Sequence, residues 1–396
     1  MNESQEPDSA LDVAGELDRL LRLARSRGAS DLHLEPAPDG LSVRLRIDGV
    51  LHDLEPLPPA LARPIVLRVK FLADLLTYRS DIPQEGRLSR DEIPELGDLR
   101  VSTFPTIHGE RLVVRFFDPD RSQRKLEGLN FPPAVLEGLR SAVSATSGVV
   151  LLTGPAGAGK TTTLYALLAA LLERGKHRPH IITVEDPVES VLKGVTQTQV
   201  NAPAGLTYAA IVRSILRQDP EVVMVGEIRD RETAEVVMQA GLTGHLVLST
   251  LHGGDIPTVI VRLLEMGLEG YLVASALKAV LAMRLVRRLC PACRRPGPEL
   301  LVHTGPRPTP LRTFEPVGCP ECALTGYAGR VPLAEFARVD ADLRKCILHT
   351  PESEAVSTQL QTQQMRSLLE RGLDLLETGT TSLAELERVL GPVRRA

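Results

Sequence analysis

The sequence contains no tryptophan and few other aromatic residues, so phenylalanine and tyrosine together make up 3% of its 396 residues. Proteins that bind single-stranded nucleic acid usually stack the bases on aromatic rings and hold the phosphates with basic residues. This chain has few rings and a formal net charge of -4. We therefore expect no nucleic-acid partner.

Long apolar runs are also missing. A helix needs about 18 consecutive apolar residues to cross a bilayer, and no segment of the sequence approaches that length. The acidic residues 1–11 lack the basic and apolar regions of a signal peptide. We expect a cytoplasmic protein without a transmembrane segment.

Cysteine is scarce as well. Of the five cysteines, four form two CxxC pairs and the fifth is Cys346. Such pairs fit a reducing compartment, where thiolates hold a metal, better than the disulfide scaffold of an exported protein. The rest of the composition, with 43% hydrophobic and 24% charged residues, is typical of a globular protein. The length predicts two or three domains.

The first part of the chain predicts a small α+β domain. Residues 1–10 are polar and acidic and are expected to form a disordered tail. Helical spacing of apolar residues follows, and then short runs in which polar and apolar residues alternate. The predicted elements are helices over 11–27 and near 65–76, and strands over 31–35, 41–47, 99–104 and 111–117. We expect the domain to span 11–118 and a charged linker to cover 119–130.

The next part alternates predicted strands and helices, a pattern that specifies a parallel sheet with helices on both faces. The predicted strands are 148–152, 180–185, 221–225 and 246–250, and the predicted helices are 132–145, 161–173, 208–217 and 233–240. We expect this α/β core to span 131–289. A proline-rich arm that carries the cysteine pairs is expected over 290–335, and a helical C-terminal region over 336–396.

Residues 154–161 match the phosphate-binding pattern GxxxxGK[ST] between a predicted strand and a predicted helix, the setting that this motif requires. Its glycines let backbone N–H groups face the phosphates of ATP, and the helix N-terminus adds a favourable dipole. We expect Lys160 to reach the terminal phosphates and Thr161 to coordinate Mg²⁺. The alternative, a glycine-rich turn with a chance lysine, is disfavoured by this setting. The predicted nucleotide-binding residues are Gly154, Pro155, Ala156, Gly157, Ala158, Gly159, Lys160, Thr161 and Thr162.

Carboxylates follow two predicted strands at the sheet edge where ligands collect. Glu227 is expected to be the general base that orients water for attack on the γ-phosphate. Gly226 precedes it in place of the usual aspartate, so the acidic residue for magnesium is expected from elsewhere. An acidic box of Glu185, Asp186 and Glu189 follows the other strand, and we count Glu189 among the catalytic candidates. By itself this box is also consistent with a solvated acidic turn.

His252 follows the predicted strand 246–250 and is expected at the same catalytic edge. We expect it to sense the γ-phosphate rather than to transfer protons. A lone histidine is more often a polar residue with satisfied hydrogen bonds than a catalytic one.

The two CxxC pairs have the spacing of a tetrahedral, four-thiolate zinc site, and a closed site of this kind is structural. The gap between the pairs is longer than the roughly 15 to 20 residues of a usual zinc ribbon. The alternative is a set of buried thiols without a metal. The predicted Zn²⁺ ligands are Cys290, Cys293, Cys319 and Cys322.

Several blocks in a fixed order resemble the ATPases of type II secretion and type IV pilus assembly. In the second domain the matching blocks are the phosphate loop, the acidic box 184–189, the segment 215–230 and the histidine box 243–252. In the first domain the matching segments are 29–36, 44–49, 83–87 and 100–103. Met283 departs from the family pattern, where glutamine is usual, and so does Gly253-Gly254-Asp255, where Thr-Asn-Asp is typical.

The resemblance implies a PAS-like N-terminal domain, a RecA-like P-loop NTPase core with a zinc-binding insertion, and a ring of six subunits. It implies a cytoplasmic motor, recruited peripherally to the inner membrane, that acts through platform proteins on pilin-like substrates. Many relatives carry a further N-terminal domain that docks on the platform, so the mode of recruitment stays open. In such a ring, arginines of one domain or subunit neutralise phosphates held by another. Our candidates are Arg87, Arg100 and Arg115, each of which is equally consistent with a surface arginine.

Three other functions remain as alternatives. A pilus retraction motor is disfavoured because motors of that kind usually lack the cysteine arm. A RecA-like nucleic-acid translocase would use the basic residues between 284 and 295, but the chain is acidic overall and poor in aromatics. A nucleotide-dependent structural subunit without turnover is disfavoured by the presence of Lys160 and Glu227.

Overall fold

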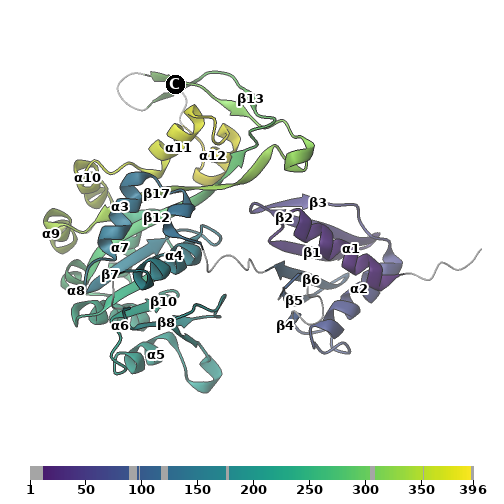
Figure 1. Cartoon of the computed structure of the whole chain (residues 1–396), viewed down its shortest axis with the longest axis horizontal. Helices are drawn as coiled ribbons and strands as arrows, with labels where there is room; N and C mark the ends of the chain where they lie inside the picture. The colour runs from purple at the N-terminus through teal and green to yellow at the C-terminus, as the bar shows by residue number, and fades with distance from the viewer. Residues whose placement is uncertain are drawn as a thin grey trace, which may run out of the picture. The chain divides into compact units, whose positions relative to one another are not determined.

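The structure is a computed structural model, and it describes residues 12–88, 96–97, 99–116, 124–174, 178–303, 308–350 and 352–393 (Figure 1). The chain divides into two compact units, Met1–Pro119 and Asp120–Ala396. The predicted tail over 1–10 and residues 119–123 of the predicted linker lie outside the described residues. Among the described residues, we find no helix with the length and apolar character needed to cross a bilayer.

In its described residues, the first unit is an α+β sandwich of one antiparallel sheet and two helices. Its six strands follow the order β3-β2-β1-β6-β5-β4. The apolar residues of the sheet and of the helices form one buried cluster, as the alternating pattern predicts. The elements are α1 Val13–Ser26, β1 Asp31–Ala37, β2 Gly40–Ile47, β3 Val50–Asp53, α2 Pro59–Leu72, β4 Gln84–Leu88, β5 Leu99–Thr106 and β6 Gly109–Phe116.

Helix α2 differs from the prediction, which placed it near 65–76. It starts at Pro59, whose fixed φ suits the first turn of a helix. It ends before Asp74, which adopts the left-handed conformation with a φ of 54°. The short strands β3 and β4 were not predicted, because neither sequence alternates polar and apolar residues.

A buried ion pair ties α2 to the sheet of the first unit. The side chains of Lys70 and Glu110 are 0% and 7% exposed. The Lys70 ammonium donates to the two carboxylate oxygens of Glu110 at 2.7 and 2.9 Å and to the carbonyl of Arg79 at 2.5 Å. The Gln84 amide also donates to the Arg79 carbonyl, at 2.8 Å. These bonds hold the loop between α2 and β4 against the core.

The second unit contains a seven-stranded sheet in the order β17-β12-β7-β11-β10-β8-β9. All neighbouring strands in it are parallel except β12 and β17. Its elements up to the cysteine arm are η2 Leu126–Leu129, α3 Pro133–Ala142, β7 Gly148–Thr153, α4 Lys160–Leu172, β8 Ile181–Glu185, β9 Thr196–Gln199, η3 Ala202–Ala204, α5 Tyr208–Ile215, β10 Val222–Val225, α6 Arg231–Leu242, β11 Leu246–Leu251, α7 Ile256–Glu265, α8 Gly270–Ala276 and β12 Leu277–Leu289.

Helices cover both faces of this sheet, as the alternation of strands and helices predicts. Along β7, Val149 and Leu151 enter one buried cluster, which includes residues of α5 to α10. The alternate residues Val150 and Leu152 enter a second cluster with α3 and α4. Two-sided burial explains why these strands are continuous apolar runs.

The C-terminal part differs from the expected division into an arm and a helical region. The long strand β17 begins inside the stretch 290–335 and pairs with β12 along most of its length, so it is part of the central sheet. Apolar residues of β12, β17 and the arm strands β14 and β15 share a buried cluster with α11 and α12. The remaining elements are β13 Arg295–Pro296, β14 Leu300–His303, β15 Pro308–Leu311, β16 Phe314–Glu315, η4 Pro320–Cys322, β17 Tyr327–Arg338, α9 Ala341–His349, α10 Ser353–Thr362, α11 Leu368–Glu377 and α12 Leu383–Leu390.

Candidate functional site

The phosphate loop connects the end of β7 to the start of α4, as the motif predicts. Gly154 and Gly159 have φ values of 148° and 95°, which other residues rarely adopt. A side chain at Gly154 would also collide with the Met283 carbonyl, which lies 2.4 Å from the ideal Cβ position. The loop therefore follows a path that exposes backbone N–H groups at the N-terminus of α4.

Lys160, the first residue of α4, folds back over the loop. Its ammonium donates to the carbonyls of Gly154 at 2.7 Å and Pro155 at 3.0 Å. Burial lowers the pKa of Lys160; Glu227 opposes this effect and the nearby Arg284 adds to it. The lysine thus sits between the loop and the strand-end glutamate.

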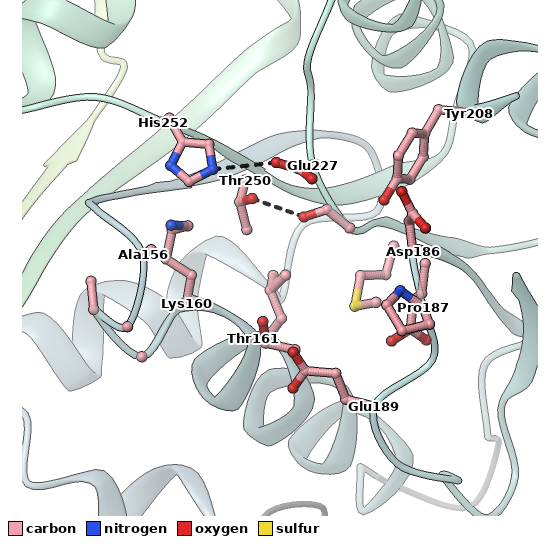
Figure 2. Close-up of a pocket in the computed structure, with 17 residues that line it drawn as sticks. Ala156, Lys160, Thr161, Asp186, Pro187, Glu189, Tyr208, Glu227, Thr250 and His252 are labelled. Carbon is pink, nitrogen blue, oxygen red and sulfur yellow. Dashed lines mark hydrogen bonds and ion pairs between the residues drawn. The ribbon is translucent and has the colours of Figure 1, made fainter. Parts of the chain in front are cut away.

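Glu227 follows β10 and is contacted by the side chains of Arg229 and His252. Its two carboxylate oxygens lie 2.5 Å from the Nε of Arg229 and 3.3 Å from the Nε2 of His252. His252 follows β11, the neighbour of β10 in the sheet. The structure thus brings Glu227 and His252 to one sheet edge, and Figure 2 shows their side chains facing each other.

The acidic box provides carboxylates in two different environments. Glu185 is 3% exposed and accepts hydrogen bonds from the Tyr165 hydroxyl, from Thr183 at 2.6 Å and from Gln197 at 3.0 Å. Asp186 is more exposed and accepts from Arg229 at 3.0 Å. Glu185 is thereby held in the fold, whereas Asp186 faces the site.

These groups line one pocket of about 250 Å³ at the carboxyl edge of the sheet. In Figure 2, Thr161 and Glu189 lie together on one side of it, and Lys160 lies on the side of His252. A hydroxyl beside carboxylates is the all-oxygen donor set that Mg²⁺ prefers, so the pocket fits a magnesium nucleotide. The lining residues are Ala156, Gly157, Ala158, Gly159, Lys160, Thr161, Leu164, Glu185, Asp186, Pro187, Glu189, Tyr208, Met224, Gly226, Glu227, Thr250 and His252.

Sequence reasoning missed three residues near this pocket. Tyr208 begins α5 and lines the pocket. Arg229 bridges Glu227 and Asp186, and its guanidinium lies 5.8 Å from the centre of the Tyr208 ring. Arg284, which the sequence placed only in a local basic cluster, donates to the Gly254 carbonyl at 2.6 Å and lies beside the phosphate loop. The position of Arg229, two residues after Glu227, was a usable signal, whereas Tyr208 and Arg284 approach only through the fold.

The three candidate arginines lie in the first unit, at one register across its sheet. Arg87 on β4 pairs with Arg100 on β5, which pairs with Arg115 on β6. Arg100 forms an ion pair with Glu85 at 2.6 Å, and Arg115 forms one with Asp31 at 2.8 Å. Directly paired residues point to the same face of a sheet, so this face presents a row of guanidinium groups.

The four paired cysteines converge at the end of β12 and the start of β17. Their sulfur atoms all lie within 4.8 Å of one another. The Cys290 and Cys319 sulfurs are 3.8 Å apart, and the Cys293 and Cys322 sulfurs are 3.9 Å apart. Zn–S bonds of about 2.3 Å give a tetrahedron with edges of about 3.8 Å. The cluster therefore has the dimensions of a four-thiolate zinc site.

Backbone N–H groups support this cluster. Cys319 and Gly326 both donate to the sulfur of Cys322 at 3.2 Å, and Gly318 donates to the sulfur of Cys293 at 3.3 Å. Burial by itself raises the pKa of Cys322, but the donors outweigh it and lower this pKa to about 6. Such donors favour the thiolate form that binds zinc.

Comparison with known proteins gives consistent results. The family model described as Type II/IV secretion system protein matches residues 7–388. The chain is 42% identical to the type II secretion system protein HxcR of Pseudomonas aeruginosa, over 94% of this chain and 76% of that protein. It is 39% identical to the type IV pilus assembly ATPase TfpB of Acinetobacter baylyi, over 98% and 68%.

Among solved structures, the Legionella pneumophila ATPase DotB matches with a TM-score of 0.69. The match covers 98% of this chain and 97% of DotB at 21% identity, so it supports the fold. The family match and the two relatives, taken with the phosphate loop and the strand-end glutamate, agree with the resemblance found in the sequence. The chain belongs to the Type II/IV secretion system protein family and is an ATP-hydrolysing enzyme.

Proposed function

We propose that the chain is a ring-forming motor that uses ATP hydrolysis to drive assembly of a type II secretion pseudopilus or a type IV pilus. The observation that carries the proposal is one pocket in which the phosphate loop meets Glu227, Asp186, Glu189 and His252. Its partners would be platform proteins at the inner membrane, with the motor itself on the cytoplasmic side. Pilin-like subunits would be its indirect substrate.

In this mechanism Lys160 exchanges the loop carbonyls for phosphate oxygens when ATP binds, because both are acceptors for the same ammonium. Thr161 and Glu189 would hold the magnesium ion, which would supply positive charge to the phosphates. Glu227 orients the attacking water and accepts its proton. To do so it must free one carboxylate oxygen from Arg229 or His252, which occupy both in this structure.

The arginine row of the first unit supports a role for a second subunit. An arginine positioned against the γ-phosphate neutralises the charge that develops during transfer. We propose that Arg87, Arg100 and Arg115 supply this charge to a nucleotide within a six-subunit ring. A PAS-like first unit and a RecA-like second unit are part of the same proposal.

We further propose that the four cysteines hold a structural Zn²⁺ ion. The ion would tie the end of β12 to the start of β17, next to the helices α11 and α12. The cysteine arm favours an assembly or secretion motor over a retraction motor. The basic residues between 284 and 295 do not outweigh the acidic net charge of the chain.

The test is steady-state ATP hydrolysis by size-fractionated full-length protein. Glu227→Gln should lower turnover by at least about 10²-fold, because it removes the general base, while nucleotide binding stays intact. The matched control is Glu221→Gln at the opposite end of β10, where the Glu221 side chain accepts from the His180 backbone N–H at 3.1 Å. Turnover that survives in Glu227→Gln refutes the assignment, and turnover stimulated by single-stranded DNA would favour the translocase.

A further inference from the structure

The end of β10 lacks the carboxylate that usually helps to hold magnesium in P-loop enzymes, because Gly226 stands there. The backbone does not require glycine at this position, since Gly226 is not among the residues with positive φ. Its N–H donates to the Val184 carbonyl at 2.8 Å, and its carbonyl accepts from the Thr250 hydroxyl at 2.8 Å. The strand end is therefore fixed in place between β8 and β11.

Another side chain occupies the space over Gly226. An ideal Cβ built on this glycine lies 3.1 Å from the hydroxyl oxygen of Tyr208 and 3.2 Å from the Val184 carbonyl. The Tyr208 hydroxyl thus lies next to the place where a side chain at position 226 would begin. The space beside Gly226 therefore holds the Tyr208 oxygen from α5 instead of a side-chain oxygen from the end of β10.

The surroundings of Tyr208 hold this hydroxyl in the pocket. The residue is 7% exposed and its ring belongs to the buried cluster on one face of the sheet. The Arg229 guanidinium covers the ring at 5.8 Å. In Figure 2 the hydroxyl points toward the carboxylate of Asp186. Burial, together with the negative charge of Glu227, raises the pKa of Tyr208, so the phenol keeps its proton.

We propose that Tyr208 is a positioning residue that replaces the missing strand-end aspartate in holding the magnesium ion of the bound nucleotide. Its oxygen accepts a hydrogen bond from a water molecule on the metal, as the aspartate would. The inference rests on the proposed function, because it requires magnesium nucleotide to bind in this pocket.

The competing role for Tyr208 is purely structural, through its ring. Tyr208→Phe separates the two roles, because it keeps the ring and removes only the hydroxyl oxygen. The matched control is Tyr271→Phe on α8, whose side chain is 63% exposed and does not line the pocket. Both variants should unfold at the same temperature as the unchanged chain.

The first readout is metal affinity rather than activity. Mn²⁺ replaces Mg²⁺, and the free ion is counted by electron paramagnetic resonance in the presence of a non-hydrolysable ATP analogue. Tyr208→Phe should weaken Mn²⁺ binding about tenfold, the usual effect of removing a group that acts through a metal ligand. Affinity for the analogue without metal should not change. Equal Mn²⁺ affinity in Tyr208→Phe and the unchanged chain overturns the proposal.

The second readout tests whether a side-chain oxygen at position 226, at the end of β10, can substitute for the Tyr208 hydroxyl. With the hydroxyl removed, the closest contact of a Cβ at position 226 is relieved. The double variant Tyr208→Phe and Gly226→Asp should recover most of the lost Mn²⁺ affinity. A folded double variant that stays as weak as Tyr208→Phe shows that the loss comes from repacking of the ring, which also overturns the proposal.

The two proposals fail in different ways. If the unchanged chain binds neither the analogue nor Mn²⁺ in its presence, the nucleotide function itself is wrong. If the unchanged chain binds both and Tyr208→Phe matches it, only the role of the hydroxyl is wrong.

Discussion

The buried pair of Lys70 and Glu110 allows a quantitative prediction about the first unit. Removing one partner leaves the other charge buried, because the two side chains are 0% and 7% exposed. At the observed 2.7 Å between the nitrogen and a carboxylate oxygen, an effective dielectric constant of about 20 gives an attraction of about 6 kcal/mol. The desolvation of two ions offsets most of this energy.

Glu110→Leu and Lys70→Met should therefore each lower the free energy of unfolding by about 3 to 5 kcal/mol. The double variant Lys70→Met and Glu110→Leu should lie within about 1 kcal/mol of the unchanged chain, since neither charge remains to be desolvated. The two single costs should thus be strongly non-additive.

Hydrogen exchange of the β6 amides, followed by mass spectrometry of the full-length chain, measures this energy in the first unit alone. It avoids the problem that a chain with two units need not unfold in one step. The reasoning is refuted if the single variants cost less than about 1 kcal/mol, or if the double variant is as unstable as either single one.

Three further predictions concern the second unit. Cys319→Ser should abolish stoichiometric zinc in the purified protein, as measured by metal analysis. It should also lower the unfolding temperature by several degrees in calorimetry, because structural zinc contributes folding energy. Unchanged zinc content would contradict the four-thiolate site. Burial raises the pKa of Glu335 above its usual 4.5, so the stability contributed by its protonated form is complete below pH 4.5 and is lost as the pH rises through the folded-state pKa. Thermal unfolding should accordingly show Glu335→Gln gaining stability relative to the unchanged chain above pH 4.5, and a relative loss would be the wrong sign. Gly159→Ala should weaken nucleotide binding in a fluorescence titration by about 5- to 30-fold, because the φ of 95° is strained for alanine at a cost of about 1 to 2 kcal/mol in the loop. Full affinity would mean that the loop tolerates another path.

Local sequence was sufficient for the parts whose chemistry depends on residues close together in the chain. The phosphate loop needs only its own eight-residue pattern between a strand and a helix, so residues 154–161 are found where predicted. The helix over 13–26 and the buried strands of both sheets follow in the same way from periodicity. The ends of α2 were missed because a proline start and a left-handed stop outweigh apolar spacing.

Pairings between distant segments could not be predicted from periodicity. Strand β17 was missed because it completes the sheet only beside β12, across the cysteine arm. The burial of Glu185 likewise depends on Tyr165 and Gln197, which come from two other elements. No local pattern distinguishes such a carboxylate from Asp186 next to it.

The sequence by itself was enough to recognise the family and the nucleotide chemistry. It also predicted the catalytic glutamate and fixed the spacing of the cysteines. Each of these depends on residue types at short, fixed separations, which remain the same whatever the rest of the chain does. Only the tertiary structure decided which distant side chains share the pocket. It placed Arg229 between Glu227 and Asp186 and the Tyr208 hydroxyl over Gly226, because those contacts follow from the way parallel strands align their ends at one edge of a sheet.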